Sequence, residues 1–173
     1  EELVRLGLSR PNAARVDRTG SGDADPATEL LERASSQLLA ALAVCRPELV
    51  ADRVGLELGT SSGGMHAATR LLAARARGEG VSAELARDAT YFAPFVEVRS
   101  GLRRAGLTVS RSVQLVTACA ASTWAIGVGL AWLRRGLVDV AIVGGYDALG
   151  LFVAAGFEAL RATSASLPAP FRI

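Results

Sequence analysis

The chain has 173 residues, 50% of them hydrophobic and 21% charged, which is enough for one compact domain with a substantial core. With a formal net charge of +2, the chain has no long-range electrostatic field that points to nucleic acid or to an anionic membrane. All nineteen basic residues are arginines, so these residues hold no lysine for Schiff-base chemistry. Two cysteines, Cys45 and Cys119, do not make a disulfide framework, and they favour a reduced, cytoplasmic compartment.

The first third of the chain predicts a loose start, one long helix and one strand. We expect residues 1–27 to be a poorly organised segment, because Asp17–Pro26 is rich in Asp and Gly and the opening residues lack signal-peptide character. Thr28–Val44 has apolar residues at helical spacing. Val54–Leu58 predicts a short strand, which enters a Gly/Ser-rich turn at 59–64.

The rest of the chain alternates helices and strands. The further predicted elements are helix Met65–Arg77, helix Phe95–Ala105, strand Ser112–Thr117, helix Ala121–Arg135, strand Val138–Val143 and helix Phe152–Arg161. The pair Ala93-Pro94 interrupts the segment before the second of these helices. The apolar run 112–133 contains polar residues and a turn, so we interpret it as a strand and a buried helix and not as a membrane span. This order predicts an α/β half-domain over residues 28–173.

Cys119 is the residue whose position suggests chemistry. A buried strand is expected to lead directly into the turn that holds it, and a helix packed on nearly all sides is expected to follow. Unpaired backbone N–H groups at a helix N-terminus stabilise negative charge, which favours a reactive thiolate. Ala118, Ala120 and Ala121 leave room for a substrate, and the arrangement is similar to the nucleophile elbow of hydrolases with sulfur in place of a hydroxyl.

Position and composition also allow simpler interpretations. Cys119 can be a small buried hydrophobic residue, as free cysteines usually are, and Cys45 is expected to be structural. His66 is expected to have a surface or packing role, and Trp124 and Trp132 are expected to pack in the core. The glycines at 59–64 are not followed by lysine and lack the spacing of a nucleotide loop, so they indicate close backbone packing.

Four separated segments carry a resemblance to a known family. Val116–Ser122 (VTACAAS), Arg135–Gly145 (RGLVDVAIVGG), Val54–Gly64 (VGLELGTSSGG) and Phe157–Phe171 follow one another as in the β-ketoacyl synthases of the thiolase superfamily. The resemblance covers residues 51–173. It implies an α/β, thiolase-like layered fold, of which this chain would form one half, with a mixed sheet flanked by helices.

The resemblance also implies an activity and partners. Cys119 would be the catalytic nucleophile, accept an acyl group from acyl carrier protein or acyl-CoA, and transfer it to a decarboxylated malonyl unit in fatty acid or polyketide biosynthesis. The Cys119 N–H would form part of an oxyanion hole. We expect a homodimer or a heterodimer with another ketosynthase-like chain, with strand Ser112–Thr117 at the interface, and no cofactor, metal or nucleic acid.

The sequence departs from the family pattern in several places. The family takes two catalytic histidines, a lysine and a second oxyanion donor from a second half, whereas these 173 residues hold one histidine, His66. The family's opening strand does not precede Glu1, and Leu107–Ser112 (LTVSRS) has no Gly-Pro pair. Tyr146-Asp147 stands where a small residue and Glu are common.

Three hypotheses follow from the resemblance and its gaps. The chain is an acyltransferase that needs a second half or a partner chain, or a non-catalytic ketosynthase-like partner of the chain-length-factor type, or a thiolase-like acyltransferase. Retention of Cys119 favours an acyl-accepting role, and the lack of the family's histidines in these residues argues against a stand-alone enzyme.

Overall fold

The structure is a computed structural model, and it divides the chain into two compact units, residues 24–148 and residues 1–23 with 149–173. The described residues are 2–5, 7–10, 24–48, 52–167 and 169. The larger unit contains α2 (Pro26–Cys45), β1 (Arg53–Gly59), α3 (Met65–Ala76), α4 (Ala83–Asp88), α5 (Ala93–Arg104), β2 (Thr108–Leu115), the 3₁₀ turn η2 (Ala118–Ala120), α6 (Ala121–Arg134) and β3 (Val140–Gly145). The smaller unit contains α1 (Glu2–Arg5) and α7 (Leu151–Ala159).

The three strands form one parallel sheet in the order β2-β1-β3. The α/β layering is as predicted, but the predicted mixed sheet is wrong for the described residues, because both pairings are parallel. Gly59 of β1 is in register with Leu115 of β2 and with Gly145 of β3. The carboxyl ends of all three strands therefore lie level at one edge of the sheet.

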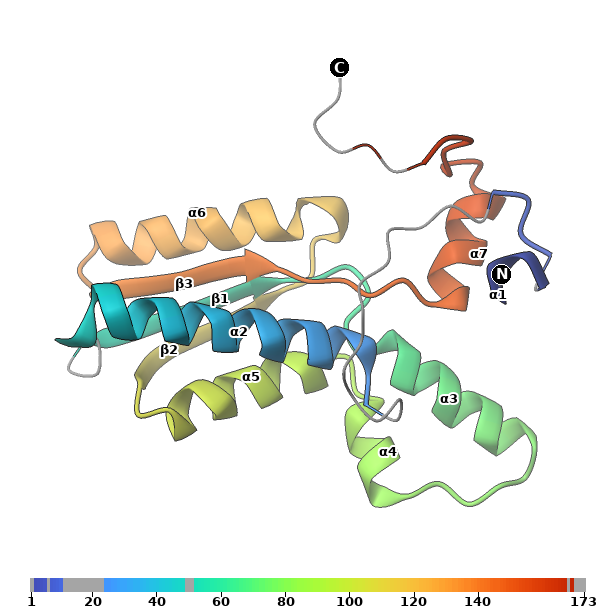
Figure 1. Ribbon diagram of the computed structural model, residues 1–173, viewed down its shortest axis with the longest axis horizontal. Coiled ribbons are helices and arrows are strands. Elements are labelled where there is room, and N and C mark those ends of the chain that lie inside the picture. Colours follow the sequence, from blue (N-terminus) through green and yellow to red (C-terminus); the bar gives the residue numbers. More distant parts are fainter. Residues whose placement is uncertain (1, 6, 11–23, 49–51, 168, 170–173) are drawn as a thin grey trace. The chain divides into compact units, whose positions relative to one another are not determined.

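Helices cover both faces of this sheet, with α6 on one face and α2 and α5 on the other (Figure 1). Since side chains alternate along a strand, Val54, Leu56 and Leu58 of β1 point toward α2 and α5. They are almost fully buried in the main apolar core. Burial of each such side chain contributes about 1.5–3 kcal/mol, and this core fixes the sheet that carries the site.

The opposite side of β1 presents Gly55, Glu57 and Gly59 toward α6. Glu57 is fully buried, and neither carboxylate oxygen has a hydrogen-bond partner among the described residues. A methyl group added at Gly55 would lie 2.6 Å from Oε1 of Glu57 and 3.1 Å from the Trp132 ring, and one added at Gly129 would lie 3.4 Å from Oε2. The carboxyl group therefore occupies an apolar space between β1 and α6, and this burial raises the pKa of Glu57 to about 7.

Two helices of the larger unit share one buried side chain at their first turns. Asp25 accepts hydrogen bonds from the backbone N–H of Ala27 (2.9 Å) and of Ala67 (2.8 Å), so this buried carboxylate joins the first turns of α2 and α3. Pro94 lies in the first turn of α5, where the missing N–H costs no helical hydrogen bond. The pair Ala93-Pro94 thus begins a helix instead of interrupting one.

Two predictions for the second half of this unit need correction. The strand predicted at 112–117 spans Thr108–Leu115. The following helix, expected to be packed on nearly all sides, buries only Ala121, Ala125 and Gly129. Trp124 is 60% exposed, so the prediction that it packs in the core is wrong, whereas Trp132 is half-buried.

In the smaller unit, Glu158 of α7 accepts a 2.7 Å hydrogen bond from the backbone N–H of Ser9. Arg10 donates a 2.7 Å hydrogen bond to the carbonyl of Thr163, so residues 9–10 are held against residues 158–163 in this unit. Most of the predicted loop Asp17–Pro26 lies outside the described residues. The division at residues 27 and 28 stays a prediction.

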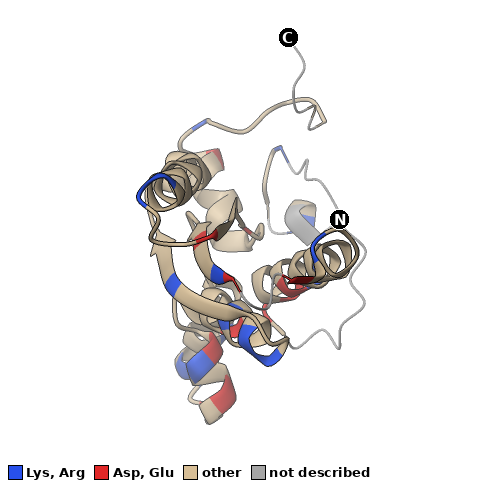
Figure 2. Cartoon of the chain, turned by 90° about the vertical axis from the view of Figure 1, so that its left-hand side faces the viewer, with Lys and Arg blue, Asp and Glu red and all other residues tan. Residues whose placement is uncertain are grey.

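The charged residues of the described part of the chain are mixed in sign, in agreement with the small net charge. Acidic and basic segments are interspersed along the ribbon, and neither sign forms a long continuous stretch (Figure 2). Among the described helices, none is both long enough and apolar enough to cross a bilayer.

Candidate functional site

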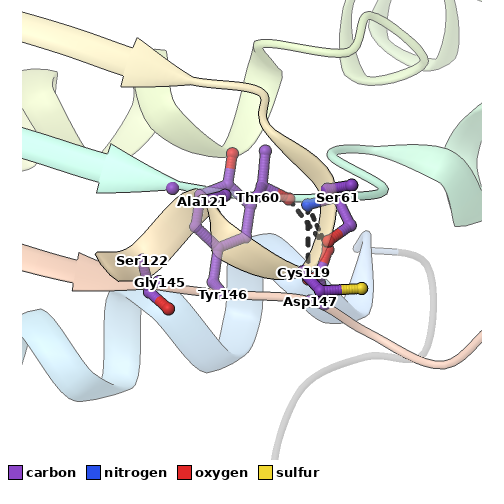
Figure 3. A pocket seen from close by; sticks show the side chains of 10 residues that line it. Thr60, Ser61, Cys119, Ala121, Ser122, Gly145, Tyr146 and Asp147 are labelled. Atoms are coloured by element: carbon purple, nitrogen blue, oxygen red, sulfur yellow. Dashed lines mark hydrogen bonds between the residues drawn. The ribbon is translucent and has the colours of Figure 1, made fainter. Parts of the chain in front are cut away.

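A cavity of about 470 Å³ opens at the edge of the sheet where the strands end (Figure 3). It is lined by the end of β1 and its turn, by η2 and the start of α6, and by the end of β3 and the two residues that follow it. The lining residues are Gly59, Thr60, Ser61, Ala118, Cys119, Ala121, Ser122, Gly145, Tyr146 and Asp147. Parallel α/β sheets bind ligands at the carboxyl ends of their strands, which is where this cavity lies.

Cys119 lies in this cavity, in the middle of η2, and is exposed. The preceding residue, Ala118, has φ +48°, a left-handed conformation that is rare for a residue with a Cβ atom. This conformation makes the turn from β2 into α6 abrupt, and Cys119 lies in the 3₁₀ turn that directly precedes α6. The predicted location of Cys119, on a strand-to-helix turn, is confirmed.

No side chain caps the N-terminus of α6. The helix dipole and the backbone N–H groups of its first turn favour negative charge at this end of the helix. An oxyanion that forms when a nucleophile attacks a carbonyl is the kind of charge that such a terminus stabilises.

Two glycines let the start of α6 lie directly against the sheet. A methyl group added at Gly59 would be 2.2 Å from the carbonyl carbon of Ala121, and one added at Gly145 would be 2.6 Å from the Cβ of Ser122. Real Cβ atoms do not approach other atoms so closely. The prediction that the glycines at 59–64 serve close backbone packing is thus confirmed at Gly59, the last residue of β1, and this packing places the helix start at the strand ends.

The turn after β1 is tied to the residue that follows β3 by one carboxylate. Asp147 Oδ1 accepts hydrogen bonds from the hydroxyl of Thr60 (2.9 Å), the N–H of Ser61 (3.0 Å), and both the N–H (2.8 Å) and the hydroxyl (2.7 Å) of Ser62. Dashed lines in Figure 3 show the bonds from Thr60 and Ser61. Burial alone would raise the pKa of Asp147, but the hydrogen bonds from Ser62 and Thr60 outweigh it and lower that pKa below its usual value. Asp147 is therefore an anion at neutral pH.

Tyr146 adds a second polar link beside the cavity. Its phenol oxygen accepts a 3.0 Å hydrogen bond from Nε2 of Gln114 on β2. Burial is the main reason that the pKa of this phenol lies above its ordinary value, so the group stays neutral. Tyr146 and Gln114 together connect the end of β2 to the segment after β3.

The other sequence candidates lie away from the cavity. His66 is in the first turn of α3 and does not line the cavity. Cys45 is exposed at the end of α2, where its thiol bonds to the carbonyl of Ala41. The described residues hold no cluster of three or more His, Cys, Asp or Glu that could bind a metal.

Sequence reasoning missed the role of Asp147, which stood out only as a departure from a family pattern. The available signal was the run Thr60-Ser61-Ser62, whose hydroxyls and backbone N–H groups need an acceptor. An acid two residues after a Gly-Gly strand end is a candidate for that acceptor, because parallel strand ends meet at one edge.

A cavity at level strand ends, with a cysteine just before a helix packed on the sheet by glycines, agrees with the thiolase-like half-domain that the sequence predicts. The sequence model described as "Beta-ketoacyl synthase, N-terminal domain" matches residues 9–172, so the chain belongs to the β-ketoacyl synthase family. A comparison with curated proteins gives no match.

A solved structure supports the same fold. It is described as a ketosynthase (ApeO) in complex with its chain length factor (ApeC) from Xenorhabdus doucetiae. The TM-score is 0.51 at 13% identity, over 75% of this chain. The match covers 50% of the solved chain, so this chain spans about half its length.

Proposed function

We propose that the chain is the nucleophile-bearing half of a β-ketoacyl synthase. The observation that carries this proposal is the exposed Cys119 on an abrupt turn, at the uncapped N-terminus of α6, in a cavity at the strand ends. The Cys119 sulfur attacks the carbonyl of an acyl thioester from acyl carrier protein or coenzyme A, and the donor leaves as its thiol. A malonyl thioester then loses carbon dioxide, its carbon forms the new bond to the acyl carbon, and the Cys119 thiol is released.

The surface of α6 supports a requirement for a second half. The helix has no charged residue before Arg134, a composition typical of a helix covered on all sides. Here only one side packs on the sheet, and large apolar side chains remain exposed on the rest. These residues are Trp124 (60% exposed), Ile126 (55%), Leu130 (44%) and Leu133 (40%). We infer that a second ketosynthase half covers this surface and brings the acid–base groups that this chain lacks.

The edge of the sheet supports dimer formation. In the described sheet, β2 has a neighbour on one side only. An edge strand with free N–H and C=O groups is a template for pairing with another strand. We expect a homodimer or a heterodimer with another ketosynthase-like chain, with β2 near the interface. The solved relative, described as a complex with a chain length factor, supports the heterodimer as one of these two outcomes.

The alternative roles are a non-catalytic partner of the chain-length-factor type and a thiolase-like acyltransferase. The exposed thiol in the cavity favours an acyl-accepting role over a purely structural partner. A thiolase-like transferase would acylate the same sulfur without decarboxylating a malonyl unit. The choice between fatty acid and polyketide synthesis is a separate question about the substrate, and so is the length of the acyl chain.

Incubation with the acetyl thioester of N-acetylcysteamine tests the nucleophile. Intact mass should increase by one acetyl group, and peptide mapping should place that group on Cys119. Cys45→Ala is the matched control, because Cys45 is also exposed but lies outside the cavity, and it should label like the wild type. Labelling of Cys119→Ala to the same extent as the wild type would refute the proposal.

A second experiment separates condensation from acyl transfer. Malonyl-carrier protein should be decarboxylated only when a complementary ketosynthase half is added to the acylated chain. Rapid decarboxylation by the isolated chain would refute the claim that acid–base groups come from elsewhere. Acylation of Cys119 with no decarboxylation in any complex would favour the thiolase-like alternative.

A further inference from the structure

One wall of the cavity is a turn whose hydrogen-bond donors converge on one side chain. Four donors from Thr60, Ser61 and Ser62 converge on Oδ1 of Asp147, at 2.7–3.0 Å. A fifth contact, 3.3 Å long, runs from the N–H of Ser61 to Oδ2. A carboxylate suits this place because it only accepts hydrogen bonds and because a charged acceptor makes stronger ones.

The same turn is braced from its other side. Thr60 Oγ1, which donates to Asp147, also accepts a 2.9 Å hydrogen bond from the N–H of Gly63. The Tyr91 hydroxyl donates to the carbonyl of Ser61. Thr60 and Ser62 are buried, at 1% and 5% exposure. The turn is therefore a fixed wall, and Asp147 is the contact that joins it to the segment after β3.

Resting on the proposed function, we propose that Asp147 is a positioning residue for acylation. Its carboxylate holds the Thr60–Ser62 turn in place as a wall of the cavity, and that wall sets where the acyl group lies relative to the Cys119 sulfur. Because these hydrogen bonds stabilise the carboxylate as an anion, Asp147 is a weak proton acceptor, and we assign it a positional role and not that of a general base. Misplacement of a reacting group by about 1 Å costs up to about 100-fold in rate, so a looser wall should slow acyl transfer.

Single-turnover acylation of the full chain tests this role. The probe is the acetyl thioester of N-acetylcysteamine, and the readout is the maximal acylation rate at saturating thioester. Asp147→Ala should lower that rate by about 10- to 100-fold. Asp147→Asn, which keeps an acceptor oxygen but loses the charge, should lower it less. Asp139→Asn is the matched control, because Asp139 pairs with Arg53 at the opposite end of the strands and should leave the rate unchanged.

Alkylation by iodoacetamide separates positioning from general damage. This small reagent needs only an exposed thiol, so its rate at Cys119 should be the same in the wild type and in the Asp147 variants. Equal acylation rates in the wild type and in folded Asp147→Ala would overturn the proposal. An equal loss of acylation and alkylation would also overturn it, because the defect would then lie in the thiol itself. Absence of acylation in the wild type would instead refute the proposed function.

Ser62→Ala provides a variant that folds more easily, since it removes one of the donors and keeps the carboxylate. It should slow acylation by itself, by a smaller factor than Asp147→Ala. In the Asp147→Ala background the same substitution should have no further effect, because both changes act through one contact. Independent, multiplicative effects of the two substitutions would contradict the proposed role.

Discussion

The buried carboxyl group of Glu57 gives the sharpest prediction for stability. Its pKa lies at about 7, against 4.5 for an exposed glutamate, because burial between β1 and α6 disfavours the charged form. One pKa unit is worth about 1.4 kcal/mol, so ionisation of Glu57 in the folded state costs about 3 kcal/mol of stability. Below pH 4.5 the group is protonated in the folded and unfolded chain alike, and this cost is absent.

The direction of this pH dependence follows from which state of the chain, folded or unfolded, holds the Glu57 proton. Between pH 4.5 and about 7, the folded chain keeps the Glu57 proton while the unfolded chain releases it. The free energy of unfolding should therefore fall as pH rises through this window and level off above it. Glu57→Gln is neutral at every pH, and its own buried amide adds only a pH-independent offset.

Urea unfolding of the wild type and of Glu57→Gln, followed by circular dichroism from pH 4.5 to 8.5, measures the effect. The free energy of unfolding of the wild type minus that of the variant should decrease by about 3 kcal/mol over that range. Other titrating groups, such as Asp139 and Asp147, act in both proteins and cancel in this difference. A difference that is flat with pH would show that Glu57 is not ionising in a buried site, and would refute the reasoning.

Three further predictions concern the start and the surface of α6. Gly59→Ala should destabilise the chain by about 1–3 kcal/mol in urea unfolding, because the new methyl group would overlap the backbone of Ala121; unchanged stability would contradict the close approach. Ala118→Val should lower stability by about 1–2 kcal/mol in thermal unfolding, because a β-branched residue resists φ +48°, whereas Ala118→Gly should be tolerated; equal tolerance of both would argue against the left-handed turn. Leu130→Glu should reduce self-association in sedimentation velocity, whereas Val44→Glu on exposed α2 should not. A reduction by Val44→Glu and none by Leu130→Glu would show that the chain does not associate through α6.

Much of the larger unit could be predicted from local patterns. Apolar spacing gave the positions of α2, α3 and α6 to within about two residues, a common accuracy for helix ends. The boundaries of β2 were predicted less well, because three of the first four residues of this strand are polar, as is common in edge strands, and only Val109 is apolar. Its last two predicted residues leave the sheet to enter the turn before Cys119.

The errors at α6 and β1 have another origin. An apolar helix such as α6 predicts burial, but the sequence of these residues does not say what covers its outer side, so Trp124 is exposed. Glu57 interrupts an apolar strand and would ordinarily suggest a solvent-facing position. Its burial depends on the space left by Gly55 and Gly129, and Gly129 lies on a different element far along the chain.

The site was predicted in part. The turn that holds Cys119 was predicted correctly, because a strand, small residues and a helix follow one another directly in the sequence. Its catalytic role stays a prediction. The network around Asp147 joins residues 85 to 87 positions apart, and no local pattern records such a pairing.

The separation between Asp147 and the turn it holds also affects biosynthesis. Residues 60–62 leave the ribosome about 85 residues before Asp147, which is a delay of about 4–17 s at usual elongation rates. During this interval the hydroxyls and N–H groups of the turn have no carboxylate to bind, although β1 and β2 can already pair. The thiol of Cys119 therefore emerges before the cavity wall is complete, and a translational pause between residues 119 and 147 would lengthen the time in which that thiol is exposed without its wall.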